Sequence, residues 1–206
     1  MGTFFLLLRS KLAERQKEEK DERKQIVEIT QELLKRSSLG DMLAFEELYK
    51  ATSGFVYNVA LNITRNCADA EEVTQDVFMK VYRNLKKFQF RSAFKTWVYR
   101  ITVNTAINRY RRAKKEEQGR LDYDGVIASF PAVNCAAESA IKSDNKEVLN
   151  KLLDKLIPEY KACLILREIE GLSYQEIVAA LRIPLNTVRS RLRRAREALL
   201  AAAGKV

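Results

Sequence analysis

The stretch GLSYQEIVAALRIPLNTVRSRLRRAREAL, residues 171–199, decides the fold of the C-terminal part of this chain. Ser173, followed three residues later by Glu176, is the pattern of a capping box and predicts the start of a short helix. A tight break at 182–184 leads into a second helix from about Asn186 to Leu200. Two short helices joined by three or four residues predict a helix-turn-helix.

The second of these helices has one apolar and one basic face. Its apolar side chains recur at i, i+4, i+7 and i+11, at Val188, Leu192, Ala195 and Leu199. Six Arg and no acid lie between residues 182 and 196. Arg side chains on such a helix can read guanine in the major groove and hold phosphates. The pattern therefore favours binding to duplex DNA.

The composition of the 206 residues excludes several classes of function. A hydrophobic share of 47% suffices for real cores, and no apolar run approaches the roughly 20 residues of a membrane span, so we expect a cytoplasmic protein. His is absent and the three Cys form no CxxC pair, so we expect no imidazole catalysis, no metal site, no cofactor and three unpaired thiols. The net charge of +10 favours a polyanionic partner.

Helices are also predicted upstream, because residues 55–118 contain neither Gly nor Pro. A helix over residues 69–87 has an apolar face, acids in its first turn and bases in its last. A second helix over residues 92–112 has a polar stripe at Arg100, Asn104, Asn108 and Arg111. Residues 41–64 are expected to form two shorter helices broken near Gly54.

The organisation that follows is all-α, with two small helical domains joined by a flexible linker. The linker is placed at residues 114–144, where apolar periodicity fades and acids dominate. The domains are then residues 26–113 and 145–206, with a charged N-terminal extension over residues 1–25.

These motifs resemble, in order and spacing, the extracytoplasmic-function (ECF) group of bacterial sigma-70 family RNA polymerase sigma factors. The segment 171–199 looks like their DNA-binding domain 4. GDMLAFEELY (40–49), DAEEVTQDVFMKVYRNLKKF (69–88) and SAFKTWVYRITVNTAINRYRR (92–112) resemble their domain 2. The similarity covers roughly residues 26 to 200.

The resemblance implies a dissociable initiation factor that binds core RNA polymerase, recognises −35 and −10 promoter elements and promotes DNA opening. It also implies no catalysis by the chain itself and no small-molecule substrate. An anti-sigma factor is a usual partner in the family. In the family the acidic linker threads the RNA exit path of the polymerase, and a plain solvated tether is the alternative.

The resemblance assigns residues to each contact. Core polymerase would be bound by Asp69, Glu72, Gln75 and Asp76. Single-stranded −10 DNA would be bound by Phe88, Arg100, Asn104, Asn108, Arg111 and Arg112. Duplex −35 DNA would be bound by Asn186, Thr187, Arg189, Ser190, Arg191, Arg193, Arg194 and Arg196.

Two departures from the family pattern bear on the site. After Phe88 the chain reads Gln89-Phe90-Arg91 in place of an Arg-Gly-Asp-like loop, which leaves the preferred −10 base open. Asn186 replaces a Gly in the turn, and we expect it to be tolerated because Asn adopts left-handed backbone and caps helices.

The main alternative is a stand-alone helix-turn-helix regulator that binds duplex DNA without polymerase, as a dimer on a palindrome. The aromatic and basic helix at residues 92–112 argues against it, because a simple repressor needs no strand-capturing domain.

Overall fold

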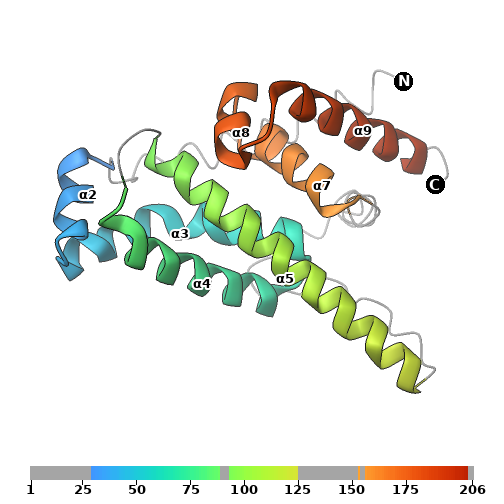
Figure 1. Cartoon of the computed structure of the whole chain (residues 1–206), viewed down its shortest axis with the longest axis horizontal. Coiled ribbons are helices and arrows are strands. Elements are labelled where there is room, and N and C mark those ends of the chain that lie inside the picture. Colours follow the sequence, from blue (N-terminus) through green and yellow to red (C-terminus); the bar gives the residue numbers. More distant parts are fainter. Residues whose placement is uncertain (1–28, 89–92, 125–152, 154–155, 204–206) are drawn as a thin grey trace, which may run out of the picture.

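The computed structural model describes residues 29–88, 93–124, 153 and 156–203, and every regular element in this part of the chain is helical. The first group of helices is α2 (Gln31–Ser38), α3 (Met42–Thr64), α4 (Cys67–Leu85) and α5 (Phe94–Asp124) (Figure 1). The second group is α7 (Pro158–Leu164), the π-helical turn η3 (Ile165–Ile169), α8 (Tyr174–Leu181) and α9 (Leu185–Ala203). The all-α prediction is confirmed. None of the described helices combines the length and the apolar character that crossing a membrane requires.

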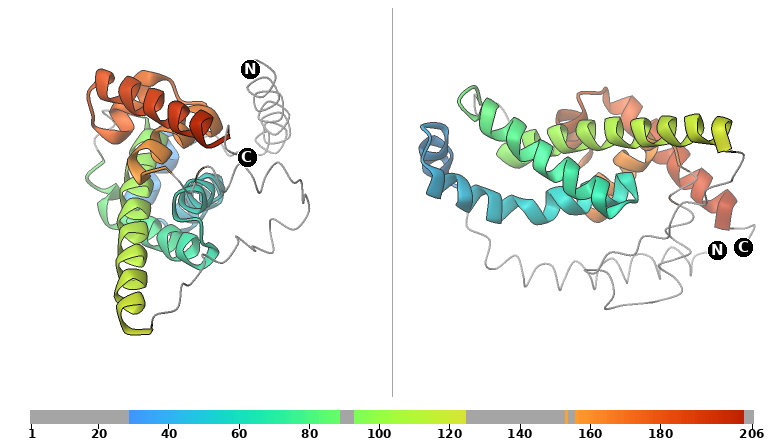
Figure 2. Two further views of the ribbon diagram at one scale, coloured as in Figure 1. Left: turned by 90° about the vertical axis from the view of Figure 1, so that its right-hand side faces the viewer. Right: turned by 90° about the horizontal axis from the view of Figure 1, so that it is seen from below.

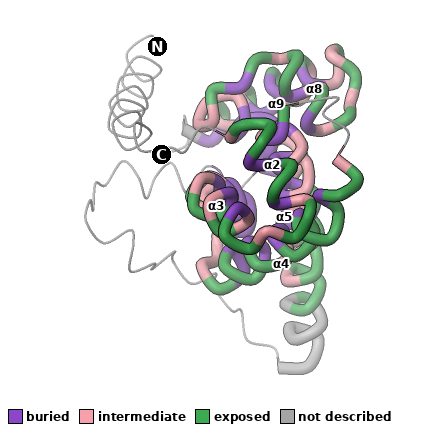
Figure 3. The backbone as a smooth tube through the Cα atoms, turned by 90° about the vertical axis from the view of Figure 1, so that its left-hand side faces the viewer, coloured by how far each residue is buried: buried purple, intermediate pink, exposed green. Residues whose placement is uncertain are grey.

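Helices α3, α4 and α5 pack against one another and form the core of the first domain, with their buried segments turned inward (Figure 3). On α4 the predicted apolar face is buried at Val73, Val77, Phe78, Val81 and Leu85. Tyr82 differs, since it is 47% exposed and meets the ring of Phe45 edge-on at 5.1 Å.

The start of α4 differs from the prediction. Asn66 is the N-cap, and its side-chain oxygen accepts a hydrogen bond from the backbone N–H of Asp69 at 3.0 Å. The helix therefore begins two residues before the predicted start at residue 69. Cys67, the first residue of α4, is disulfide-bonded, so the expectation of unpaired thiols is wrong at this position. Cys163 is a buried free thiol, as expected.

The prediction of two short helices broken at Gly54 is wrong, because α3 is continuous from Met42 to Thr64. Gly54 is exposed, and a Cβ built on it would meet nothing within 4 Å. A lone glycine in a helix costs only about 1 kcal/mol relative to Ala. Burial of Leu48 and Val56 on either side of Gly54 outweighs that cost.

Helix α5 is longer than predicted and reaches Asp124, so its last turns occupy residues 114–124 of the expected linker. The segment AKKEEQ that begins at Ala113 consists of strong helix formers, and they extend the helix without an apolar face of their own. The remaining linker residues, the extension 1–25, the loop at 89–92 and most of residues 145–155, at the start of the predicted second domain, lie outside the described residues.

The second group of helices contains the two helices predicted for the helix-turn-helix, α8 and α9. Pro158 is the first residue of α7, and Gly171 adopts a φ of +70° where the helical run ends. The run finishes as a π-helix, with the N–H of Glu170 bonded to the carbonyl of Ile165 at 3.0 Å. The capping box of α8 is complete: the Ser173 hydroxyl accepts a hydrogen bond from the backbone N–H of Glu176, and the Glu176 carboxylate accepts one from the backbone N–H of Ser173.

The two domains touch. Helix α5 packs against α7 and α8, and α3 contacts α7 and η3. The second domain lies across the N-terminal part of α5, while the C-terminal part of α5 extends away from the other helices (Figures 1 and 2). The buried apolar residues of both domains form one continuous cluster.

Candidate nucleic-acid interface

Helix α9 presents part of its basic face to solvent. Arg189 is exposed, and Arg193 has a 67% exposed side chain that pairs with Glu197 one turn later at 3.0 Å. Arg194 is also exposed and donates to the hydroxyl of Tyr160 at 3.0 Å. All three guanidinium groups lie at the surface of α9, and those of Arg193 and Arg194 are bonded to neighbouring side chains.

Two other Arg residues of α9 are used inside the protein. Arg196 is 2.7 Å from the carboxylate of Glu168, and both side chains are about one third exposed. Arg191 is half-buried and lies beside the thiol of Cys163. Burial raises the pKa of the Cys163 thiol, and the nearby Arg191 opposes that rise.

In the turn of the helix-turn-helix, the residue with left-handed backbone is not Asn186, as was expected. The left-handed position is Arg182, with φ 54°, whereas Asn186 lies exposed within the first turn of α9. Thr187 is half-buried in the same turn, and its carbonyl accepts the hydroxyl of Ser190 at 3.0 Å. Asn186 has no left-handed backbone and lies inside the helix, so neither expected role, a left-handed turn residue or a helix cap, applies to it.

On α5 the predicted polar stripe faces the second domain. Asn104, Asn108 and Arg111 line a pocket of about 430 Å³ whose other walls include Glu159 of α7 and Arg191 of α9. All three side chains are exposed to solvent within it. Residues expected at two different DNA elements thus share one pocket.

The other residues predicted to bind −10 DNA lie in different surroundings. Arg112 is exposed on α5. Arg100 is half-buried, and its pKa is lowered by burial and by the positive charge of Arg182 in the second domain. Phe88 is half-buried, with its ring centroid 5.1 Å from Trp97 and 5.8 Å from Phe94. This aromatic cluster is a surface on which an extruded base could stack.

The four residues of α4 that are predicted to bind core polymerase divide into two kinds. Glu72 and Gln75 are exposed and Asp76 is half-exposed, so these side chains are available to a partner. The carboxylate of Asp69 is only 11% exposed and is 2.7 Å from Nη2 of Arg109 on α5. Asp69 therefore joins α4 to α5 in the structure.

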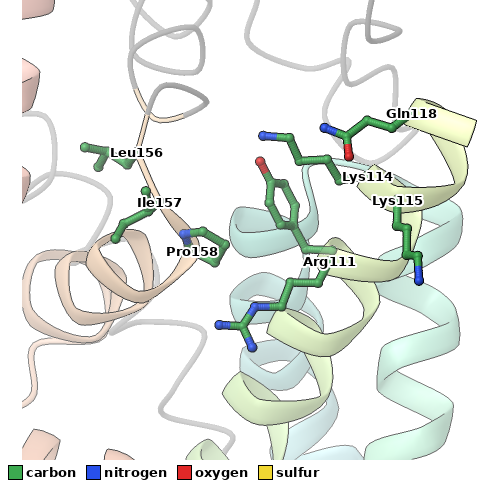
Figure 4. A pocket seen from close by; sticks show the side chains of 8 residues that line it. Arg111, Lys114, Lys115, Gln118, Leu156, Ile157 and Pro158 are labelled. Atoms are coloured by element: carbon green, nitrogen blue, oxygen red, sulfur yellow. The ribbon is translucent and has the colours of Figure 1, made fainter. Parts of the chain in front are cut away.

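The contacts between the domains were not among the sequence predictions. The hydroxyl of Tyr99 donates to Glu170 at 2.5 Å, and Arg111 is ion-paired with Glu159. The ammonium of Lys161 lies 5.2 Å from the ring centroid of Tyr110. Arg111 also joins Lys114 and Lys115 on one wall of a second pocket, of about 290 Å³, opposite Leu156, Ile157 and Pro158 (Figure 4). No local pattern signals these pairs, because their members are about 50 to 70 residues apart.

Comparison with known families matches both domains. The sigma-70 region 2 family matches residues 48–116, and the sigma-70 region 4 family matches residues 146–199. The likeness therefore extends over the helices of both groups, which a stand-alone helix-turn-helix regulator would not explain.

Curated relatives agree. The ECF RNA polymerase sigma-E factor of Escherichia coli is 35% identical over 178 residues, which cover 82% of this chain and 91% of that protein. The RNA polymerase sigma-H factor of Pseudomonas aeruginosa is 32% identical over 82% of this chain and 91% of its own length. The ECF RNA polymerase sigma factor SigE of Mycolicibacterium smegmatis is 37% identical over 161 residues, which cover 77% of this chain and 61% of that protein.

Two solved structures share the fold. CnrH, in complex with the cytosolic domain of CnrY, superposes with a TM-score of 0.61 at 23% identity, covering 84% of this chain and 96% of that one. The sigma factor RpoE of Bartonella quintana, in complex with the anti-sigma factor NepR, gives a TM-score of 0.61 at 24% identity, covering 78% and 96%. The two matching regions and the curated relatives show that the chain belongs to the ECF group of sigma-70 family RNA polymerase sigma factors.

Proposed function

We propose that this chain is a dissociable transcription initiation factor that binds core RNA polymerase, recognises a two-element promoter and opens it. The observation that supports the proposal is that one chain carries two surfaces whose chemistry suits nucleic acid. One is the exposed basic face of α9, and the other combines the polar stripe of α5 with the aromatic cluster at Phe88. The first suits a major groove and the second suits a single strand.

The face of α9 would read the −35 element. Arg189 lies closest to the N-terminus of the helix among its exposed Arg residues, where a recognition helix approaches base edges. Arg193 and Arg194 follow one turn later and would hold phosphates, together with the first-turn residues Asn186 and Thr187. Ser190, Arg191 and Arg196, which the structure engages internally, would contribute after rearrangement.

The α5 surface would hold the −10 element. Amide groups such as those of Asn104 and Asn108 can bond to the edge of an extruded base, while Arg100, Arg111 and Arg112 would track the backbone. Phe88 would offer its ring for stacking. Capturing unpaired bases in this way favours the open form of the duplex.

The exposed acidic side of α4 would bind the polymerase. Glu72, Gln75 and Asp76 present one carboxylate-rich surface, which suits a basic or polar partner helix. Asp69 would act indirectly, by holding α4 against α5 through Arg109.

The domain scheme remains part of the proposal. Residues 26–113 would form domain 2 and residues 145–206 domain 4, with the connection after α5 as the linker. The chain would act in the cytoplasm, where the polymerase and the chromosome are, and would perform no covalent chemistry itself. An anti-sigma factor is the proposed regulator, since both structural neighbours were solved as complexes with a partner of their own.

The decisive experiment is transcription by purified core polymerase, with and without this protein, on fragmented genomic DNA from its own source. New start sites that share two spaced sequence elements are expected. Arg189→Ala and Asn104→Ala serve as variants, the first expected to weaken −35 use and the second to impair opening while leaving core binding intact. Absence of both core binding and new starts would overturn the proposal in favour of a stand-alone DNA-binding regulator.

A further inference from the structure

A pocket of about 290 Å³ lies between the C-terminal half of α5 and the residues that lead into α7 (Figure 4). This volume is close to the low end of the roughly 300–1,000 Å³ that small-molecule sites occupy. The wall that α5 provides carries three cations, whereas the opposite wall consists of residues 156–158, which are all apolar. The pocket therefore has two walls of different chemistry.

The α5 wall suits an anion. The eight described residues that line the pocket include Arg and Lys but no carboxylate. Arg111 and Lys114 reach from α5 toward the start of α7, while Lys115 is turned to the opposite side (Figure 4). The guanidinium of Arg111 is paired with Glu159, yet its side chain is 60% exposed, and a guanidinium has five donors. Arg111 and Lys114 can therefore bind a phosphate group through charge-assisted hydrogen bonds.

The opposite wall and the ring of Tyr110 provide an apolar surface. Ile157 is 49% exposed although its side chain is large and apolar, and Pro158 continues this surface into α7. Tyr110 is half-buried, and the ammonium of Lys161 lies 5.2 Å from its ring centroid. A flat apolar group bound here would cover Ile157 and the ring of Tyr110, and the burial of that surface would favour its binding.

A ligand uses both walls only if it has an anionic part and a flat apolar part. An inorganic anion would leave Ile157 in water, and an uncharged ring would make no use of Arg111 and Lys114. A nucleotide has both parts, and the amide of Gln118 can donate to and accept from the edge of its base. A factor that works with RNA polymerase also meets nucleoside triphosphates, because they are the substrates of that enzyme.

We propose that this pocket binds a free nucleotide. Its base lies between Tyr110 and Ile157, and its phosphates bind the cations of the α5 wall. The inference goes beyond the proposed function, which assigns no role to Tyr110, Lys114 or Ile157. A pocket of this size suits a single nucleotide, whereas a nucleic-acid strand binds in a groove that follows its backbone. A bound nucleotide touches both walls and therefore stabilises the folded chain.

The test measures nucleotide binding by the full-length chain, with N-methylanthraniloyl-ATP as the fluorescent probe and with ATP, GTP and inorganic pyrophosphate as competitors. Lys114→Gln removes a charge from the α5 wall, and Lys35→Gln removes the same charge from the exposed side of α2. Ile157→Asn makes the apolar wall polar. Leu39→Asn is its matched control, because Leu39 is 77% exposed at the end of α2. Circular dichroism checks that each variant keeps its helices.

ATP and GTP are expected to displace the probe, and pyrophosphate is expected to do so at least about ten-fold less well, because it leaves the apolar wall uncovered. Lys114→Gln should weaken nucleotide binding about five-fold relative to Lys35→Gln. Ile157→Asn should weaken it about three-fold or more relative to Leu39→Asn. ATP should also raise the Tm of the wild-type protein more than that of Lys114→Gln or Ile157→Asn.

Three results would overturn the proposal. Millimolar ATP and GTP that fail to displace the probe would show that the pocket takes no nucleotide. Pyrophosphate that competes as well as ATP would indicate a general attraction of anions to a chain of net charge +10. Equal affinities of Ile157→Asn and Leu39→Asn would mean that the apolar wall is not part of the site.

A fluorescein-labelled single-stranded DNA 15-mer of mixed sequence distinguishes a free nucleotide from a nucleotide within a strand. Weaker ATP binding by Ile157→Asn with unchanged 15-mer binding supports the proposal. If both ligands lose the same factor, the pocket holds part of a strand and the assignment to a free nucleotide is wrong. These measurements need neither polymerase nor promoter, so their failure leaves the proposed function standing, and a failure to initiate transcription leaves the pocket's ligand standing.

Discussion

Arg109 of α5 spans the groove to α4 and holds the carboxylate of Asp69, with Nη2 2.7 Å and Nε 2.9 Å from the same Oδ1 atom. Its Nε is also 3.2 Å from the more exposed carboxylate of Glu72. One side chain thus ties the helix proposed to dock on polymerase to the helix proposed to hold DNA. Their relative position depends on a pair that lies 40 residues apart in the chain.

Asp69→Asn should therefore destabilise the first domain. Asp69 is 8% exposed, and weakening its charge-assisted bonds to Arg109 is expected to lower the free energy of unfolding by about 1–3 kcal/mol. Urea unfolding followed by circular dichroism measures this loss. Glu72→Gln is the control and should cost less than about 1 kcal/mol, because its side chain is 57% exposed. Equal losses for the two variants would contradict this ranking.

Gly54→Ala should stabilise the chain by about 0.4–1 kcal/mol, since it adds no clash and removes freedom from the unfolded state. Thermal unfolding gives the comparison. Gly171→Ala is the matched opposite: space is also available there, yet the φ of +70° strains any Cβ-bearing residue. A stabilised Gly171→Ala would show that the turn rearranges.

Ser173→Ala should cost about 1 kcal/mol of stability at neutral pH, because it removes the hydroxyl that accepts the N–H of Glu176 at 3.2 Å. Denaturant unfolding of the full chain measures the loss. Ser173→Asn keeps a capping acceptor and should restore most of it. A loss of equal size with Asn would mean that the cap is not the cause.

Stability should also depend on pH through Glu176. Hydrogen bonds from the side chain and backbone of Ser173 lower the pKa of this carboxyl below its usual 4.5. A depressed pKa gives stability that is present above the unfolded-state value and is lost as the pH falls through the folded-state value. Relative to Glu176→Gln, the wild-type protein should be more stable at pH 7, and the difference should vanish as the pH falls below 4.5. A difference that persists unchanged in acid would exclude the carboxylate as its source.

Arg189→Ala should cost about 1–3 kcal/mol in promoter binding by the polymerase complex and relax the preference at one −35 base pair. Binding to a set of single-base −35 variants measures both effects. Arg193→Ala removes another exposed Arg of α9 and should weaken all sequences alike, as the loss of a phosphate contact does. If Arg189→Ala also weakens all sequences equally, Arg189 holds a phosphate instead.

The most local features were predictable from the sequence. The Ser173–Glu176 capping box, the Pro158 start and the apolar face of α4 depend on residues within a turn or two of each other. Such patterns act through backbone hydrogen bonds and helical periodicity, which need no knowledge of distant contacts. For the same reason the helix-turn-helix was recognisable before its geometry was known.

Predictions that depended on helix breaking were wrong. The cost of Gly54 within a helix is small and is outweighed by burial of its neighbours. The residues after Arg112 are strong helix formers, so they extend α5 beyond the predicted end. The start of α4 at Cys67, two residues before the predicted start at residue 69, is a shift of the same kind. Where two residues a few positions apart could each begin a helix, the helix begins at the one that lets its apolar face pack against the core.

By itself the sequence determined the helical class, the apolar and basic faces, and the family, since all of these follow from residue types at fixed spacings. Only the tertiary structure decided which charges are available to a partner. Asp69 and Arg196 have internal partners, Arg191 is turned toward Cys163, and Arg111 is held by Glu159, while Arg189 is exposed. The physical reason is that the partner of a charged side chain depends on which residues pack beside it, and packing brings together residues that are far apart in the chain.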